Sequence, residues 1–233
     1  MSKKYVFVLF LLCFIIVSCS VDDPNTISLK EIKAVEKSIH SFENYKLTYN
    51  DCYNSLAPYF SDMSISSTLD NLPLLPTNLG IYGIGFNNKI FTSLDIKDLN
   101  IDELDKYYNE NVKNIIKDLY GDISKPISFS ISDSYDTSAG RYYYTSAKYE
   151  IKNILDPNSN KNIKLTFYRK YLVSNYDEQE KIISIESNLQ IDNRFEIDPN
   201  YESYKENYEM ITKNVLDNFF ENTSIIFTDT IPY

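Results

Sequence analysis

The sequence predicts an α+β fold, in which N-terminal helices precede a four-stranded antiparallel sheet and a C-terminal helix. Apolar residues recur at three- and four-residue steps between residues 29 and 63 and again between 102 and 120, which is the period of a helix. Between residues 127 and 197 the apolar residues alternate with polar ones, which is the period of a strand. The helical period returns after Asp198-Pro199 and predicts a helix over about 200–221 whose inward-facing residues are Tyr204, Tyr208, Ile211, Val215, Leu216 and Phe219. We therefore expect one α+β domain over residues 29–233.

The first residues differ from everything that follows. Lys3 and Lys4 precede an unbroken apolar run from Tyr5 to Val17. Basic residues before an apolar stretch of about 7–15 residues are typical of a secretory signal. The run is also shorter than the roughly 20 apolar residues that a helix needs to span a bilayer. We therefore predict a signal peptide at residues 1–18 and a domain that works outside the cytoplasm.

The end of this segment, Ile16-Val17-Ser18-Cys19, resembles the lipobox of bacterial lipoproteins. A lipobox places an aliphatic residue and two tolerated positions, the last of them small, before a cysteine; Ile16 stands where Leu is commoner. The resemblance implies a lipid on the Cys19 thiol, cleavage before Cys19 and attachment to the cell membrane. Residues 19–28 would then form a short lipidated tether. The alternative is an ordinary cleaved signal, or an uncleaved anchor, with a cysteine there by chance.

The charge balance argues against nucleic acid as a partner. Removing residues 1–18 takes away two lysines, so the remaining 21 basic and 33 acidic residues give a net charge of −12. Nucleic acid and anionic lipid head groups repel such a domain. The lipid, rather than charge, would therefore hold it at the membrane. Cys52 is the only cysteine after Cys19, so the domain has no pair of cysteines for an internal disulfide.

Two helices are predicted at the start of the domain, over 28–46 and 48–62. Ser28 and Glu31 have the spacing of a capping box, in which each side chain accepts a hydrogen bond from the other residue's backbone. Pro58 predicts a kink or a break in the second helix.

The segment between these helices and the sheet has three predicted parts. Residues 64–80 contain two prolines and read as a loop. A hairpin is predicted over 81–94, with its turn at Asn87-Asn88. A helix is predicted over 102–120, and Gly121 is a suitable residue to end it. Its predicted core-facing residues are Leu104, Tyr107 or Tyr108, Val112, Ile115, Ile116 and Leu119.

The four predicted strands carry apolar residues at odd-numbered positions and mostly polar ones at even-numbered positions. They are 127–135, 143–151, 163–173 and 183–191. This pattern predicts a sheet with one dry face, covered by helices, and one wet face. The turns predict a register in which Phe129 lies opposite Tyr149, Tyr149 opposite Arg169, and Arg169 opposite Ser187. A shift of one residue in the pairing would move every side chain of a strand to the opposite face of the sheet.

This register places Arg169 on the dry face, where a charge needs a partner or a path to water. One interpretation is a cavity in which Arg169 binds an anionic group of a small ligand, with Tyr149 and Tyr171 as walls. The other is a structural role, in which Arg169 forms a salt bridge to an acid on a covering helix or to Asp133 further along the same face, or extends its guanidinium to the edge of the sheet.

No catalytic or metal-binding pattern stands out. The chain has no G-x-S-x-G serine, and its single histidine, His40, is predicted to lie at the surface or a boundary. A zinc site usually needs several His or Cys ligands. The run Asp156 to Asn162 lacks the Gly and Glu that a calcium loop requires. Cys52 sits on an apolar stripe without basic neighbours and reads as a buried apolar residue. We expect no cofactor and no metal.

The order of elements resembles the NTF2-like and cystatin-like folds in architecture only, because no motif accompanies it. The sequence leads us to expect a non-enzymatic, lipid-anchored extracytoplasmic protein that acts as an interaction or assembly module at the cell envelope, with a protein partner. One alternative is a small-ligand-binding lipoprotein that uses Arg169. Another is a carboxylate hydrolase acting on the cell wall, because Asp and Glu are plentiful and their spacing in the fold cannot be read from the sequence.

Overall fold

The fold is described from a computed structural model of the 233-residue chain. The structure describes residues 26–72, 74–75, 96–153, 156, 158–197 and 199–230. The predicted signal peptide, Cys19 and the hairpin predicted over 81–94 lie outside these residues. Within them, no helix combines the length and the apolar character that crossing a membrane requires.

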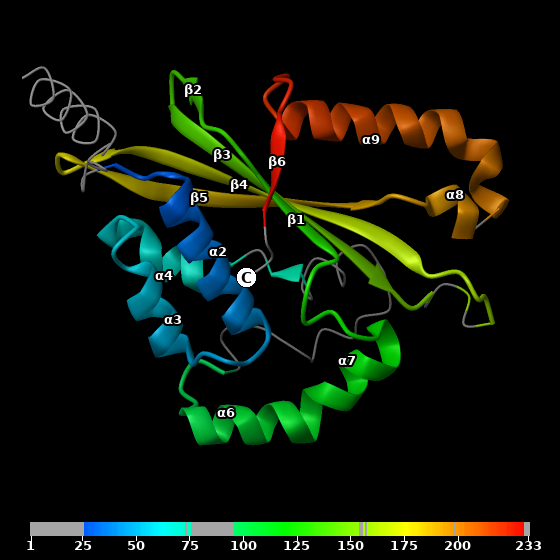
Figure 1. Ribbon diagram of the computed structural model, residues 1–233, viewed down its shortest axis with the longest axis horizontal. Helices are drawn as coiled ribbons and strands as arrows, with labels where there is room; N and C mark the ends of the chain where they lie inside the picture. The colour runs from blue at the N-terminus through cyan, green and yellow to red at the C-terminus, as the bar shows by residue number, and fades with distance from the viewer. Residues whose placement is uncertain are drawn as a thin grey trace, which may run out of the picture.

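An antiparallel sheet lies at the centre of the described part of the chain (Figure 1). Its six strands are β1 (Ser128–Ser132), β2 (Tyr135–Thr137), β3 (Gly140–Ile151), β4 (Ile163–Tyr176), β5 (Gln179–Ile191) and β6 (Phe227–Thr230). Their spatial order is β5-β4-β3-β1-β6, and β2 pairs with β3. The α+β class is confirmed, but the prediction of a four-stranded meander is not: β6 extends the sheet beyond β1, and β2 is a separate short strand.

The pairing of β4 with β5 agrees with the prediction, since Arg169 lies opposite Ser187. The other two predicted registers are wrong, by two residues between β1 and β3 and by four residues between β3 and β4. Arg169 therefore lies opposite Thr145 and not Tyr149. Both errors are even numbers of residues, so odd-numbered side chains still share one face of the sheet.

A β-bulge changes this alternation near the start of β5. Val173 lies opposite Ile182, whereas Leu172 lies opposite Ser184, so Ile183 is an extra residue on β5. One extra residue exchanges the two faces of a strand. Ile182 is accordingly buried and Ile183 is half-buried, which corrects the prediction that Ile183 belongs to the dry face.

Three helices, α2 (Leu29–Glu43), α3 (Tyr49–Leu56) and α4 (Asp62–Asp70), lie against the odd-numbered face of the sheet (Figure 1). They enclose the main core, whose largest fully buried side chains include Phe42, Leu56, Phe60, Leu69, Phe129, Phe167 and Tyr171. The capping box of Ser28 and Glu31 is present at the start of α2, as predicted.

The predicted break at Pro58 is also present. α3 ends at Leu56, and Phe60 then forms a parallel bridge with Ile182 of β5. The boundaries after the break differ from the prediction. The second helix was expected to reach residue 62 and a loop to begin at 64, whereas α4 spans Asp62–Asp70. The helix starts anew because the bridge at Phe60 takes the backbone out of the helical path.

The helix predicted over 102–120 is interrupted. α6 (Ile101–Tyr107) and α7 (Lys113–Tyr120) are joined by a π-helical turn at Tyr108–Val112, and α7 ends at Gly121, whose φ is 79°. A π turn inserts extra backbone into a helix, so the residues after it are rotated relative to a continuous helix. Ile115, predicted to face the core, is therefore 41% exposed, and Tyr120 is fully buried in its place.

The even-numbered face, predicted to be wet, is covered as well. Tyr142 and Tyr144 of β3 form a second buried cluster with Phe219 from α9 (Lys205–Phe219). α9 follows α8 (Arg194–Ile197) and a short 3₁₀ helix (Pro199–Tyr204), and it lies across the sheet from α2 (Figure 1). The alternating period shows which side chains share a face but not whether a helix covers the other face, where the rings of Tyr142 and Tyr144 are large apolar surfaces.

We predict that Gly140→Ala destabilises the fold by at least about 2 kcal/mol. Gly140 has a φ of 139°, and an added Cβ would collide with the carbonyl oxygen of Val173. Gly121→Ala is the matched control: its φ is also positive, but the nearest side-chain atom, Cγ of Lys152, would be 3.8 Å away, so about 1 kcal/mol of backbone strain is expected. Urea unfolding of both variants measures the difference, and equal losses would contradict the steric argument.

Candidate functional site

Arg169 of β4 lies in the interface between the sheet and α2, with 3% of its surface exposed. Two carboxylates of α2 face it. Nη1 of Arg169 is 2.7 Å from Glu36 Oε2, and Nη2 is 2.5 Å from Glu43 Oε1. Glu36 and Glu43 are seven residues apart, which is two helical turns, so one side of α2 presents both acids to the same guanidinium.

The remaining oxygens of this network are also occupied. Glu36 Oε1 accepts hydrogen bonds from Thr145 Oγ1 at 2.5 Å and from the hydroxyl of Tyr171 at 2.6 Å. Glu43 Oε1 also accepts the backbone N–H of Leu75 at 2.8 Å. The Phe167 ring lies against the guanidinium, with its centroid 4.8 Å from Cζ. These contacts allow charged groups to be buried, because each carboxylate is both paired and hydrogen-bonded.

Of the two interpretations of Arg169, the structure shows the salt bridge to a covering helix. The partners are Glu36 and Glu43, and not Asp133, which is exposed. Tyr171 joins the network through Glu36, whereas Tyr149 is a separate core residue whose pKa is raised by burial. The binding role predicted for these residues therefore stays a prediction, and the geometry supports a structural one.

His40 of α2 and the backbone of Leu75 also shape the electrostatics of Glu43. Burial by itself raises the pKa of Glu43, but attraction to Arg169, the neighbouring His40 side chain and the hydrogen bond from the Leu75 N–H outweigh it, so its pKa lies below the ordinary value. His40 is 8% exposed, with Nδ1 3.7 Å from Glu43 Oε2, and the Asn44 amide is 3.2 Å from its Nε2. The prediction of a surface or boundary histidine is thus corrected, because His40 is part of the buried side of α2.

Cys52 lies in the core, fully buried, as the sequence predicted. Burial, and to a smaller extent the charge of Glu43, raises the pKa of its thiol to about 12. Because the thiolate is the reactive form of cysteine, Cys52 is chemically inert at neutral pH.

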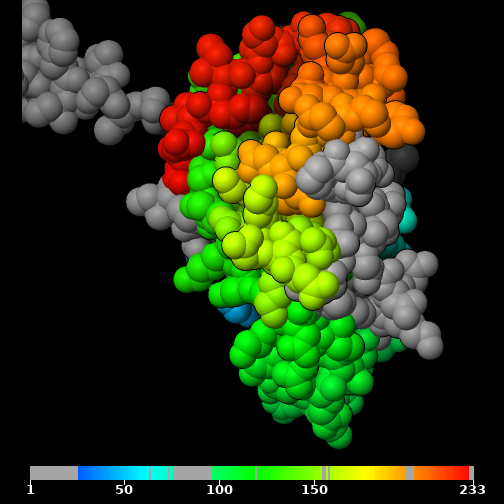
Figure 2. All heavy atoms as spheres, turned by 90° about the vertical axis from the view of Figure 1, so that its right-hand side faces the viewer, coloured from blue at the N-terminus to red at the C-terminus, as the bar shows by residue number. Residues whose placement is uncertain are grey.

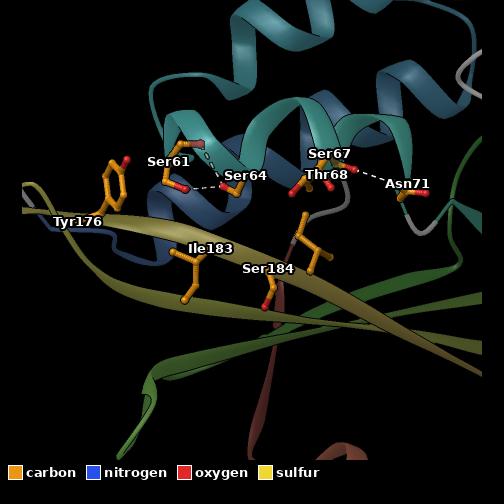
Figure 3. A pocket seen from close by; sticks show the side chains of 9 residues that line it. Ser61, Ser64, Ser67, Thr68, Asn71, Tyr176, Ile183 and Ser184 are labelled. Atoms are coloured by element: carbon orange, nitrogen blue, oxygen red, sulfur yellow. Dashed lines mark hydrogen bonds between the residues drawn. The ribbon is translucent and has the colours of Figure 1, made fainter.

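A hydroxyl-lined groove of about 580 Å³ runs between α4 and the hairpin of β4 and β5 (Figure 3). Its lining is uncharged and comprises Ser61, Ser64, Ser67, Thr68, Asn71, Tyr176, Ile183, Ser184 and Ile185. Several of these polar groups bond within α4: the Ser61 and Ser64 hydroxyls are 2.6 Å apart, and the Asn71 amide donates to the Ser67 carbonyl at 2.9 Å. The Tyr176 phenol is the one ionisable side chain in this lining, which contains no carboxylate, histidine, lysine or cysteine.

The outer face of α9 and the turn before it carry large apolar side chains in solvent, and we call these residues the α9 row. They are Tyr204 (63% exposed), Met210 (56%), Ile211 (57%) and Val215 (46%). The sequence predicted that Tyr204, Ile211 and Val215 face inward, and this is wrong. Only the end of α9 reaches the sheet, where Phe219 and Phe220 contact Tyr144 and Tyr168.

The α9 row adjoins a groove and an acidic surface. The groove, of about 510 Å³, lies between α9, the end of β5 and α8, and Phe195, Tyr208 and Leu216 contribute its apolar lining. Between residues 202 and 221 the chain has five acidic and two basic side chains. One of the basic ones, Lys205, is already engaged by Glu202 at 3.6 Å. Sequence reasoning found the apolar period of α9 but could not tell which side of the helix the sheet would leave uncovered.

Among the described residues, no group of three or more His, Cys, Asp or Glu side chains could hold a metal ion. Comparisons with known proteins find no matching family model, no similar curated protein and no similar solved structure. The resemblances to bacterial lipoproteins and to NTF2-like or cystatin-like architecture therefore stay predictions.

We predict that Arg169→Met destabilises the protein by about 3–5 kcal/mol, because it leaves two buried carboxylates without their cation. Combining it with Glu36→Gln and Glu43→Gln should recover part of that loss, since no charge is then left unpaired in the interface. Urea unfolding at pH 7 of the wild type, the single variant and the triple variant measures both steps. A triple variant no more stable than Arg169→Met would contradict this account of the network.

The lowered pKa of Glu43 predicts an acid-sensitive contribution to stability. A carboxyl whose folded-state pKa is depressed stabilises the fold above its unfolded-state pKa of about 4.3, and the contribution disappears as the pH falls through the folded-state value. The wild type should therefore lose more free energy of unfolding than Glu43→Gln when the pH is lowered from 7 to 3. Glu110→Gln, at an exposed position, is the control and should parallel the wild type. The prediction would be contradicted if the difference in free energy of unfolding between the wild type and Glu43→Gln were the same at pH 7 and pH 3.

Proposed function

We propose that this chain is a lipid-anchored extracytoplasmic protein that acts as a non-enzymatic interaction or assembly module at the cell envelope. The α9 row carries the proposal. A run of large apolar side chains that are each about half exposed is unusual on a soluble domain and marks a surface that another molecule covers. The resemblance of the segment ending at Cys19 to a lipobox supports the membrane location.

The partner is a protein whose contact surface is apolar and flanked by lysine or arginine. Charge complementarity predicts lysine or arginine on the partner, because the surroundings of the α9 row are acidic, with Glu206, Glu209 and Asp217 along the helix. A second copy of this chain would bring like charges together. An anionic lipid surface would be repelled for the same reason. The groove beside Tyr208 and Leu216 provides a concave site for an apolar anchor of the partner.

The two other functions that the sequence allowed have less support. A ligand site at Arg169 would have to compete with Glu36 and Glu43, which already match its charge in the core. The same two carboxylates cannot act on a cell-wall glycan, because they are buried and bonded to Arg169.

The proposal is tested by photo-crosslinking in intact cells that carry the full-length protein. A photoreactive amino acid at Ile211 or Val215 should capture the same protein, and one at the exposed Glu110 of the π-helical turn should not. Cys19→Ala should abolish the capture, because the unlipidated chain is no longer held at the membrane. With the captured protein purified, Ile211→Asp should weaken binding by about tenfold or more without a change in melting temperature.

The control for Ile211→Asp is Asn109→Asp, which adds the same charge at an exposed site away from α9. Equal capture from Ile211 and Glu110 would show that the α9 row is not the contact surface. Capture of a second copy of the chain would replace the proposed partner by self-association. An unchanged affinity of Ile211→Asp for the captured protein would also refute the proposal.

A further inference from the structure

Ile27 belongs to the segment predicted to be a polar tether, yet it is held in the fold with 4% of its surface exposed. Its backbone N–H donates to Glu180 Oε2 at 2.8 Å. Its carbonyl accepts from the Tyr143 hydroxyl at 2.7 Å and from Arg141 Nη2 at 3.1 Å. Arg141 and Glu180 also form an ion pair with each other. We call Arg141, Tyr143 and Glu180 the Ile27 clamp.

The Ile27 clamp holds Ile27 against the sheet. The next residue, Ser28, is the N-cap of α2 and is bonded to Glu31, so the chain is attached to the fold at Ile27 and at Ser28. Eight peptide units separate Cys19 from Ile27. At no more than about 3.6 Å per residue, whatever their conformation, they span at most about 29 Å.

The clamp lies at one end of a long domain. Arg141 is next to the first residue of β3, and Glu180 is the second residue of β5, opposite Asn175. Both are therefore beside the β4–β5 turn at Asp177–Glu178, at the left of Figure 1. The β3–β4 loop and α8 lie at the opposite end, the one that faces the viewer in Figure 2. The 14 residues of β4 run between the two ends, a distance of about 40 Å.

We infer that the Ile27 clamp orients the domain on the bilayer, with the β4–β5 turn toward the lipid head groups and α8, with the first half of α9, away from them. The inference rests on the proposed lipid at Cys19. The tether keeps the clamped end of the domain within about 29 Å of the lipid on Cys19. The opposite end is about 40 Å farther along β4 and can therefore lie farther from the membrane than the length of the tether. The turn itself carries Asp177 and Glu178 and is repelled by anionic head groups, so it lies near the surface without entering it.

This orientation has a consequence for the α9 row. Tyr204, Met210 and Ile211 belong to the half of the helix region near α8, at the end of the domain opposite the Ile27 clamp. A partner would therefore meet the row from the side away from the membrane that carries this chain.

Fluorescence quenching from the bilayer tests the orientation. The full-length lipidated protein is labelled on a single introduced cysteine, Gln179→Cys beside the turn or Asn160→Cys in the β3–β4 loop, both at exposed positions. Cys52 is buried and does not compete for the label. The protein is placed in vesicles of phosphatidylglycerol and phosphatidylethanolamine that carry a nitroxide on the head group. The label at 179 should be quenched and the label at 160 should not.

Loosening the clamp should reduce the difference in quenching between the labels at 179 and 160. Arg141→Ala with Glu180→Ala removes two of the three hydrogen bonds to Ile27 and effectively lengthens the tether. Tyr143→Phe removes the third alone and keeps the test available if the double variant does not fold. Lys161→Ala is the control, because it removes a surface contact, to the Glu196 carbonyl, at the far end of the domain.

Each outcome is decisive. Equal quenching at the two labels, or stronger quenching at 160, overturns the orientation and leaves the lipid anchor intact. If the clamp variants keep the wild-type difference in quenching between the two labels, the Ile27 clamp does not set the orientation. Failure of the wild-type chain to float with the vesicles overturns the anchor itself, and with it the proposed function.

Discussion

The structure depends on one ion network between the sheet and its first helix. Arg169, Glu36 and Glu43 are charged groups in a core, and burying them is favourable only when their geometry and hydrogen bonds are complete. Thr145, Tyr171 and the Leu75 backbone provide those bonds. Such a network accepts only one rotation of α2 about its axis and one position along β4. It thereby places Ser28 at the start of α2 and, beside it, Ile27 in its clamp.

The opposite layer is attached at the next residue of the same strand. Successive side chains of a strand point to opposite faces. Lys170 is therefore on the other side of the sheet from Arg169, where it lies 2.7 Å from Glu221 just beyond α9 and 4.4 Å from the centroid of the Tyr142 ring. The centre of β4 thus holds both helical layers. Phe219 and Glu221 attach the C-terminal end of α9 to the sheet, and Tyr208 packs against Phe195 of α8 with ring centroids 5.4 Å apart, whereas the side chains of the α9 row stay in solvent.

The charged chemistry in the described core is used for architecture. The buried acids bind Arg169, the histidine lies against Glu43, and the cysteine is inert. What the described surface offers instead is an apolar row in acidic surroundings and a neutral groove. The proposed interaction role rests on the apolar row.

The sequence by itself determined the α+β class and the face of the sheet on which the odd-numbered side chains lie. It also determined the capping box at Ser28, the burial of Cys52 and the β4–β5 register. Each of these follows from local periodicity or a short turn. Only the tertiary structure decided the β3–β4 register, since a long loop does not fix which residues pair across it. The same holds for the bulge at Ile183, which exchanges the two faces of β5 before it, and for the π turn before α7, which rotates the helix after it. Sequence periodicity identified the apolar stripe of α9 and the unusual position of Arg169. It could not identify the partners of Arg169, because Glu43 is 126 residues away along the chain and comes into contact only when α2 packs on the sheet.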